Sequence, residues 1–251
     1  MWACSLAVVA IIVVPLAQMV VQPSWQDLRD CLRDRQVLGA IGLSLEAAAM
    51  AAAISLVCGT PFAYLLARKE FAGKKLAESI IDLPIMIPHP VIGIAILAVA
   101  SPDHWLGKFM LEAGIEIMGS LTGIVAVLTF VGLPFYVNTV KNGFEAVDQR
   151  LENVARSLGA SFGSAFVRVT LPLAWRSMLA GVIMCMARAL SEFGAVVIVA
   201  YHPMIASVLI YERFTAYGLK YSQPVAVVLI LISLLLFVMM RMVGKPRGKG
   251  P

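Results

Sequence analysis

The sequence predicts an all-α, polytopic membrane protein that is built as one bundle of transmembrane helices. Of the 251 residues, 60% are hydrophobic and only 14% are charged, and the mean hydropathy is +0.88. A soluble domain is about 45–50% apolar and about 25% charged. Six apolar segments also have roughly the 20 residues that cross about 30 Å of hydrocarbon. These observations exclude a soluble enzyme and a disordered regulator, and they predict a single domain over residues 1–251.

The six apolar segments differ in regularity. The first has about 20 apolar residues and no basic residue before it, so we interpret it as a retained span rather than a signal peptide. The second is interrupted at Gly59-Thr60-Pro61, and the third carries Pro84, Pro88 and Pro90, which predicts an irregular span. The expected spans are 3–22, 38–66, 78–100, 119–140, 177–200 and 223–243.

The basic residues predict the orientation of these spans. Thirteen of the 20 Lys and Arg residues lie in segments 68–77 and 141–176 and in the tail from Arg241 to Lys249. Six lie in the alternate segments, and Arg188 lies inside a span. Because positive residues concentrate on the cytoplasmic side, both termini are expected in the cytoplasm. The predicted location is the cell membrane, crossed several times.

The longest segment between spans, 141–176, has its own helical pattern. Leu151, Val154, Ala155 and Leu158 recur at helical spacing, Asp148 is placed to cap the start and Gly159 to end the helix. Ser161 offers a second N-cap. The pattern predicts a short amphipathic helix, a glycine turn and a second helix over about 148–172, held against the cytoplasmic end of the bundle. An interfacial helix lying on lipid headgroups fits the same pattern.

The ionisable residues considered within the expected spans form two groups, the pair Arg188 and Glu192 and the single residue His89. Arg188 and Glu192 are four residues apart in the fifth expected span, so they share a helical face and can neutralise each other. His89 lies among the prolines of the third expected span at a similar depth. Ionisable groups at such depth face a bundle interior or an aqueous cavity. Either the pair fastens the fifth span to its neighbours, or Arg188 lends positive potential to a passing anion.

The sequence contains no motif typical of an enzyme active site. The four cysteines have no CxxC spacing, and neither a GxxxxGK[ST] loop nor an HExxH motif occurs. We therefore expect no catalytic residue, no metal ligand and no cofactor bound by this chain, and no ATP hydrolysis of its own.

The 151–172 segment resembles the EAA loop of permease subunits of ABC importers. That family's pattern is Glu-Ala-Ala, three residues, Gly, nine residues and Ile-x-Leu-Pro. Ala155, Gly159, Leu171 and Pro172 match it, and Val169 replaces the Ile. Asn153 and Val154 depart from it, and Glu152 comes one position early. The resemblance implies a coupling helix, between spans four and five, that docks on a separate ATP-binding subunit.

Other segments resemble the subgroup that imports tetrahedral oxyanions. Asp82–Gly93 and Arg188–Gly194 are similar to molybdate, tungstate and sulfate permeases, and Ile210–Gly218 is closer to the molybdate/tungstate type. The resemblance implies alternating access in a homodimer, within membrane lipid, with two cytoplasmic ATP-binding subunits that use ATP and Mg²⁺, and with an extracellular oxyanion-binding protein. It implies no nucleic-acid partner. A sulfate permease and a stand-alone secondary transporter are the alternatives.

Two groups of site residues follow. The residues expected to contact the ATPase subunit are Leu151, Glu152, Asn153, Ala155, Arg156, Gly159, Ala160, Ser161 and Phe162. Those expected along the translocation pathway or its gate are Pro88, His89, Pro90, Arg188, Ser191 and Glu192.

Overall fold

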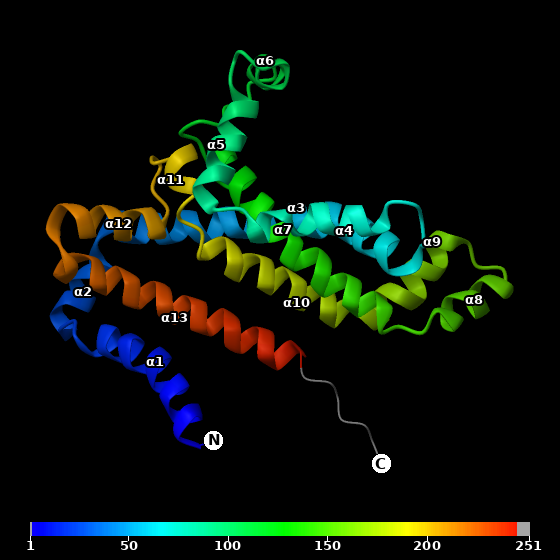
Figure 1. The fold of residues 1–251 in the computed structure, drawn as a ribbon, viewed down its shortest axis with the longest axis horizontal. Helices are drawn as coiled ribbons and strands as arrows, with labels where there is room; N and C mark the ends of the chain where they lie inside the picture. Colours follow the sequence, from blue (N-terminus) through cyan, green and yellow to red (C-terminus); the bar gives the residue numbers. More distant parts are fainter. Residues whose placement is uncertain (1, 245–251) are drawn as a thin grey trace. The chain divides into compact units, whose positions relative to one another are not determined.

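The computed structural model describes residues 2–244, which form helices and contain no strand (Figure 1). The all-α prediction is therefore confirmed. The elements are α1 (Trp2–Val21), α2 (Trp25–Arg33), α3 (Arg35–Arg68), α4 (Lys74–Met86), α5 (His89–Ala100), α6 (Trp105–Glu112), α7 (Leu121–Glu145), α8 (Gln149–Ser157), α9 (Phe162–Ala165), the π-helical turn η1 (Phe166–Thr170), α10 (Leu171–Leu190), α11 (Val196–Val199), α12 (Ala206–Tyr217) and α13 (Leu219–Gly244).

The chain divides into two compact units. The first comprises Met1–Ser44 and Met204–Leu234, and the second comprises Leu45–Pro203 and Leu235–Pro251. In the first unit, Asp34 pairs with Arg213 of α12, and the Ser44 hydroxyl accepts a hydrogen bond of 2.8 Å from the Ala206 N–H. The segment between the first two expected spans forms the helix α2. A capping box formed by Ser24 and Asp27 begins this helix.

Three helical segments are each long and apolar enough to cross a membrane: α3, α7 and the continuous stretch Phe162–Leu190. Two bent pairs raise the number to five if each pair is one span. Leu6–Val21 and Trp25–Arg33 meet at 76°, and α4 and α5 meet at 112°. The bend between α4 and α5 confirms the irregular third span. Leu219–Leu235, from the sixth expected span, is a shorter apolar helix.

The count of six spans and the cytoplasmic termini stay predictions. The tail residues Lys245, Arg247 and Lys249, which contribute to the predicted orientation, lie outside the described residues.

The predicted limits of the fifth span are wrong. The helix ends at Leu190 rather than near 200, and Ser191 is its C-cap. The chain turns here because the Glu192 carboxylate accepts a hydrogen bond of 2.9 Å from the Ala195 N–H, which satisfies a backbone group that a continuing helix would pair internally. The apolar run that follows forms the separate helix α11. Composition alone cannot distinguish such a turn from a continuing helix.

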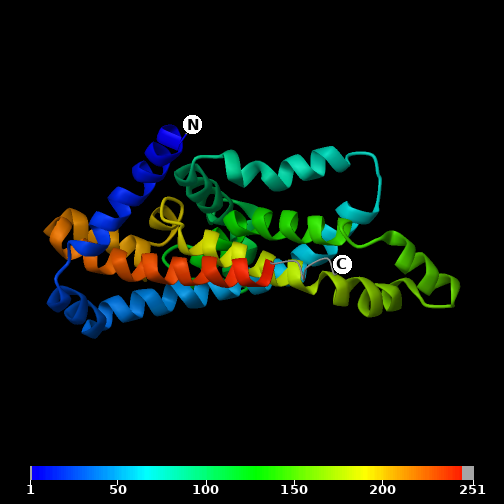
Figure 2. The same ribbon diagram turned by 90° about the horizontal axis from the view of Figure 1, so that it is seen from below.

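The core of the second unit lies where α7 packs on α10, and both views show these helices side by side (Figures 1 and 2). Glycines allow the close approach: a Cβ atom on Gly132 would lie 2.6 Å from the Cys185 sulfur, and one on Gly143 would lie 2.2 Å from Ser177 Cβ. Small residues at helix contacts are typical of membrane bundles, where close packing replaces the hydrophobic effect.

Replacing Gly143 with alanine is expected to lower the stability of the protein by about 1–3 kcal/mol, because the new methyl group overlaps Ser177. Gly163→Ala is the matched control, since a Cβ atom there meets nothing within 4 Å. Thermal unfolding of the two purified variants in detergent makes the comparison. Equal unfolding temperatures would contradict the close approach of α7 and α10.

Candidate functional site

Residues 148–172, which we call the coupling loop after the expectation from the sequence, extend beyond the end of α7 in both views (Figures 1 and 2). The Asp148 carboxylate accepts a hydrogen bond of 2.9 Å from the Arg150 N–H and so caps α8. Gly159 has φ +93°, the left-handed conformation that ends a helix and favours glycine. The Ser161 hydroxyl then caps α9 at 3.2 Å from the Ser164 N–H. The helix, glycine turn and second helix of the sequence prediction are all present.

One buried carboxylate connects this loop to α3. Glu152 of α8 accepts hydrogen bonds from the Tyr64 hydroxyl at 2.7 Å, the Thr170 hydroxyl at 2.6 Å and the Arg68 Nε at 2.9 Å. Arg68 also donates to the Val147 carbonyl at 2.9 Å. The side chains of Arg68 and Glu152 are only 6% and 8% exposed. Glu152 therefore joins α8, η1 and α3 through charge-assisted hydrogen bonds, which are the stronger kind.

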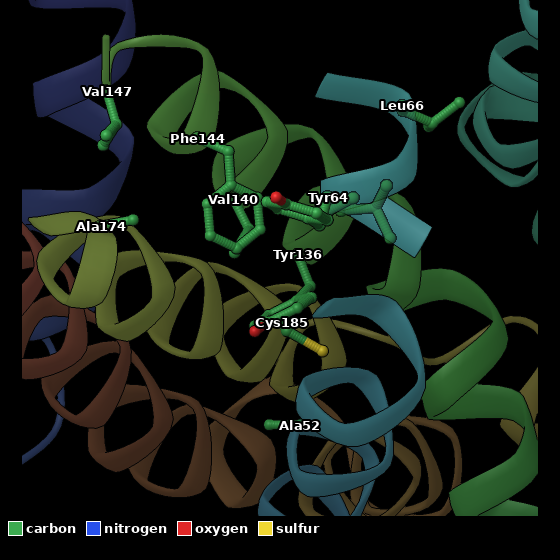
Figure 3. Close-up of a cluster of buried hydrophobic side chains, with 11 residues drawn as sticks. Ala52, Tyr64, Leu66, Tyr136, Val140, Phe144, Val147, Ala174 and Cys185 are labelled. Atoms are coloured by element: carbon green, nitrogen blue, oxygen red, sulfur yellow. The ribbon is translucent and has the colours of Figure 1, made fainter. Parts of the chain in front are cut away.

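The electrostatics of Glu152 follow from these contacts. Burial alone raises the pKa of this carboxyl, but the hydrogen bonds from Thr170 and Tyr64 and the charge of Arg68 outweigh it, so the pKa is lowered. Glu152 therefore stays ionised in its buried position. The aromatic rings of Phe144, Phe162 and Phe166 surround Tyr64 at centroid distances of 5.5, 5.6 and 4.8 Å. Figure 3 shows the Tyr64 and Phe144 side chains next to each other in the hydrophobic cluster, where their rings make an edge-to-face contact.

The apolar face of α8 is largely exposed, although the Glu152 contacts hold this helix at the end of α3. Leu151, Val154 and Leu158 are 48%, 59% and 84% exposed, and Phe162 is 52% exposed. The polar contacts of Glu152, rather than the apolar stripe, fasten α8. Of the other expected contact residues, Asn153, Arg156, Gly159 and Ser161 are exposed, and Ala155 and Ala160 are half-buried.

The second group of expected site residues meets at the bend between α4 and α5. Pro88 is the N-cap of α5, His89 is its first residue and Pro90 is the next. Arg188 and Ser191 stand at the end of α10. Arg188 Nη2 lies 2.9 Å from Glu192 Oε2 and 2.9 Å from His89 Nε2. We call His89, Arg188, Ser191 and Glu192 the Arg188 cluster.

The Arg188 cluster is buried on the side of Glu192 and exposed on the side of His89 and Ser191. The Glu192 side chain is 0% exposed, the Arg188 side chain 16% and the His89 side chain 41%. Ser191 is exposed, and its hydroxyl lies 3.3 Å from Arg188 Nη1. Arg188 is three residues beyond Cys185, which touches Gly132 near the middle of α7, so the cluster lies at a depth within the spans. The structure thus brings His89, Arg188, Ser191 and Glu192 together.

Several polar contacts of the second unit were not expected from the sequence. Between α4 and α7, Asn138 donates to Asp82 at 2.7 Å, and Lys141 pairs with Glu78. Tyr64, Arg68 and Thr170, the partners of Glu152, were also missed. The described residues contain no group of three or more His, Cys, Asp or Glu side chains that could hold a metal ion.

Together, the membrane-spanning helices, the exposed loop and the ionic cluster inside the spans are the features of a membrane subunit of a transporter. Residues 59–245 match the family model described as binding-protein-dependent transport system inner membrane component. The chain therefore belongs to this family, and it is a multi-pass protein of the cell membrane.

Named relatives cover nearly the whole chain. The molybdate/tungstate transport system permease proteins WtpB of Thermococcus kodakarensis and Methanocaldococcus jannaschii are 43% and 41% identical to it. These matches cover 94% and 95% of this chain and 92% and 93% of the relatives. A probable sulfate transport system permease protein of Nephroselmis olivacea is 33% identical over 79% of this chain and 72% of its own.

Solved structures share the fold. A bacterial ABC transporter involved in the import of the acidic polysaccharide alginate matches with a TM-score of 0.72 and 17% identity, over 97% of this chain and 96% of the other. The MetNI methionine ABC transporter matches with a TM-score of 0.66 and 17% identity, over 83% and 96%. At this identity the likeness concerns the fold, which is that of ABC importer subunits.

Proposed function

We propose that this chain is the permease subunit of an ATP-driven importer of tetrahedral oxyanions, with molybdate or tungstate as substrate. The names of relatives that are 41–45% identical to the chain carry the substrate assignment. A sulfate permease is the second candidate, supported by the 33% identical relative. The chain works as a homodimer in membrane lipid. It has no enzymatic activity and binds no cofactor, because two partner subunits bind and hydrolyse ATP with Mg²⁺.

The exposed apolar face of the coupling loop supports a docking role. Leu151, Val154, Leu158 and Phe162 present four large apolar side chains to solvent, and a cluster of this kind favours contact with another protein. The ATP-binding subunit is the partner that the family resemblance assigns to this position. Glu152 then transmits the movement of the docked α8 to α3 through Arg68 and Tyr64. An extracellular oxyanion-binding protein delivers the substrate, and the chain alternates access.

Flux measurements in proteoliposomes test this proposal. With the ATP-binding subunits and the binding protein present, ATP is expected to drive molybdate or tungstate uptake, and sulfate is expected to compete weakly. Uptake that proceeds without any ATP-binding subunit would support a stand-alone secondary transporter and overturn the proposal. Strong uptake of sulfate with little of molybdate would reassign the substrate.

Leu158→Asp is expected to weaken binding of the ATP-binding subunits by about 30-fold or more, because it places a charge at the centre of an apolar contact. The fold should survive, since Leu158 is 84% exposed. Gln149→Glu is the matched control. It adds the same charge to the opposite face of α8, also at an exposed position. Co-purification of the subunits at graded concentrations measures the difference, and equal binding by the two variants would exclude this face from the contact.

A further inference from the structure

The π-helical turn η1 has a cause in the sequence. At its end the Leu171 N–H donates to the Phe166 carbonyl, five residues earlier, where an α-helix would use the carbonyl four residues earlier. Pro172 follows directly. It has no N–H, and in a regular α-helix its ring would clash with the Arg168 carbonyl. We attribute the π turn to Pro172, because the chain stays helical over Phe162–Leu190 although a regular α-helix cannot continue undisturbed through a proline.

One face of this long helix makes contacts along its length with α3, α7 and α8. The Phe166 ring lies 4.8 Å from Tyr64 and 5.9 Å from Phe144 between centroids, and the Thr170 hydroxyl donates to Glu152. Further along α10, Ala174 belongs to the hydrophobic cluster of Figure 3. The contact positions are Phe162, Phe166, Thr170, Ala174, Ser177 and Gly181.

The spacing of these positions does not fit a regular α-helix. An α-helix turns by about 100° per residue, so each step of four residues exceeds a full turn by about 40°. Phe162 and Gly181 are 19 residues apart, which leaves them about 100° from a common face in an unbroken α-helix. A π turn contains one residue more than an α turn and absorbs this excess. It therefore places the end of the coupling loop and the packed face of α10 on the same side.

Removing the π turn would break this alignment. A regular α-helix would turn the two ends of the Phe162–Leu190 helix by about 100° relative to each other. On the α10 side there is no room for rotation, because a Cβ atom on Gly143 would already lie 2.2 Å from Ser177 Cβ. The coupling loop would therefore rotate instead, and Phe166 would leave Tyr64.

We propose that Pro172 is a positioning residue for the coupling of ATP hydrolysis to transport. By causing the π turn, it keeps the coupling loop aligned with α10. A movement that the ATP-binding subunit imposes on α8 then reaches α10 through the hydrogen bond between Glu152 and Thr170. A regular α-helix at this place would preserve the docking surface and α10 but would rotate one against the other. This inference rests on the proposed function.

Pro172→Ala in the complete transporter tests the inference, because alanine permits a regular α-helix. ATP-driven molybdate uptake per ATP hydrolysed, measured in proteoliposomes, is expected to fall at least about fivefold. The ATP-binding subunits should still co-purify, since Leu158 and its apolar neighbours on α8 remain exposed. Pro61→Ala is the matched control. It removes an exposed proline from inside α3, where the helix has no π turn, and it should keep the wild-type coupling.

A second variant restores the alignment by another route. Val167 lies within η1 and is 58% exposed, and its deletion removes the extra residue of the π turn. Combined with Pro172→Ala, the deletion gives a regular α-helix whose two ends again share a face, so uptake per ATP should return toward the wild-type value. Deletion of Val167 alone retains the proline and should remain uncoupled.

The outcomes separate the inference from the proposed function. Wild-type coupling in Pro172→Ala overturns the inference, and so does a double variant that fails to insert or to regain coupling. If Pro172→Ala alone fails to insert, the double variant still decides, because a regular helix in the correct alignment should insert and transport. Absence of ATP-driven uptake by the wild-type transporter would instead contradict the proposed function.

Discussion

Replacing Glu152 with alanine is expected to uncouple ATP hydrolysis from transport and to destabilise the second unit. Arg68 would remain with its side chain only 6% exposed and without its carboxylate, and breaking a buried ion pair costs about 3–5 kcal/mol. Because Glu152 fastens α8 to α3, uptake per ATP hydrolysed should fall about 5- to 150-fold, the range of typical coupling free energies.

Two neighbouring variants separate these effects. Glu152→Gln keeps an acceptor for the Tyr64 and Thr170 hydroxyls but removes the charge opposite Arg68, so an intermediate loss is expected. Asn153→Ala changes an exposed residue of the same helix and should leave the unfolding temperature unchanged. Uptake and ATPase rates in proteoliposomes, with thermal unfolding in detergent, provide the measurements. A Glu152→Ala protein with wild-type stability and coupling would show that this contact is dispensable.

The contribution of Glu152 to stability should also depend on pH. Because the pKa of this carboxyl is lowered from its ordinary value of 4.5, the folded state binds fewer protons than the unfolded state. The stabilisation is therefore fully present well above pH 4.5 and is lost as the pH falls through the lower pKa of the folded state. The difference in unfolding temperature between wild type and Glu152→Gln should be largest near pH 7 and shrink in acid.

Local sequence patterns predicted the coupling loop well because its structure is set by local rules. Asp148, Gly159 and Ser161 act through hydrogen bonds or dihedral angles within a few residues, so their spacing alone indicates helix, turn and helix. The spacing of Arg188 and Glu192 likewise predicted their pairing, which the structure contains at 2.9 Å. The sequence could also suggest that His89 lies at a similar depth.

Local sequence patterns do not predict contacts between distant segments of the chain. Glu152 meets Arg68 and Tyr64 across more than 80 residues, and no spacing rule relates them. The apolar stripe therefore predicts a helix, but it does not show that the ionic contact of Glu152 fastens this helix and leaves the stripe exposed. The end of α10 was misplaced for a related reason. The apolar composition of this segment does not predict that the Glu192 carboxylate accepts a hydrogen bond from the Ala195 N–H and so stabilises the turn.

Removing the charge of Arg188 is expected to have the second large effect, and a pair of variants decides between a structural and a transport role. In Arg188→Gln the wholly buried Glu192 loses the cation opposite it, which should cost about 3–5 kcal/mol of stability. In the double variant Arg188→Gln/Glu192→Gln both charges are absent. Most of the stability should return, because replacing a buried ion pair by neutral groups is often close to neutral.

Transport is expected to behave differently from stability. A hydrogen bond to a charged group contributes about 1.5–3 kcal/mol, which corresponds to roughly 10- to 100-fold in affinity or rate. The double variant should therefore regain its unfolding temperature but remain at least about tenfold below wild type in ATP-driven molybdate uptake. If uptake returned together with stability, Arg188 and Glu192 would only fasten the turn after α10 to α5, and the oxyanion would cross without Arg188. Persistent loss of uptake in a stable protein would instead assign the guanidinium to the path of the anion, since the fold would then no longer depend on its charge.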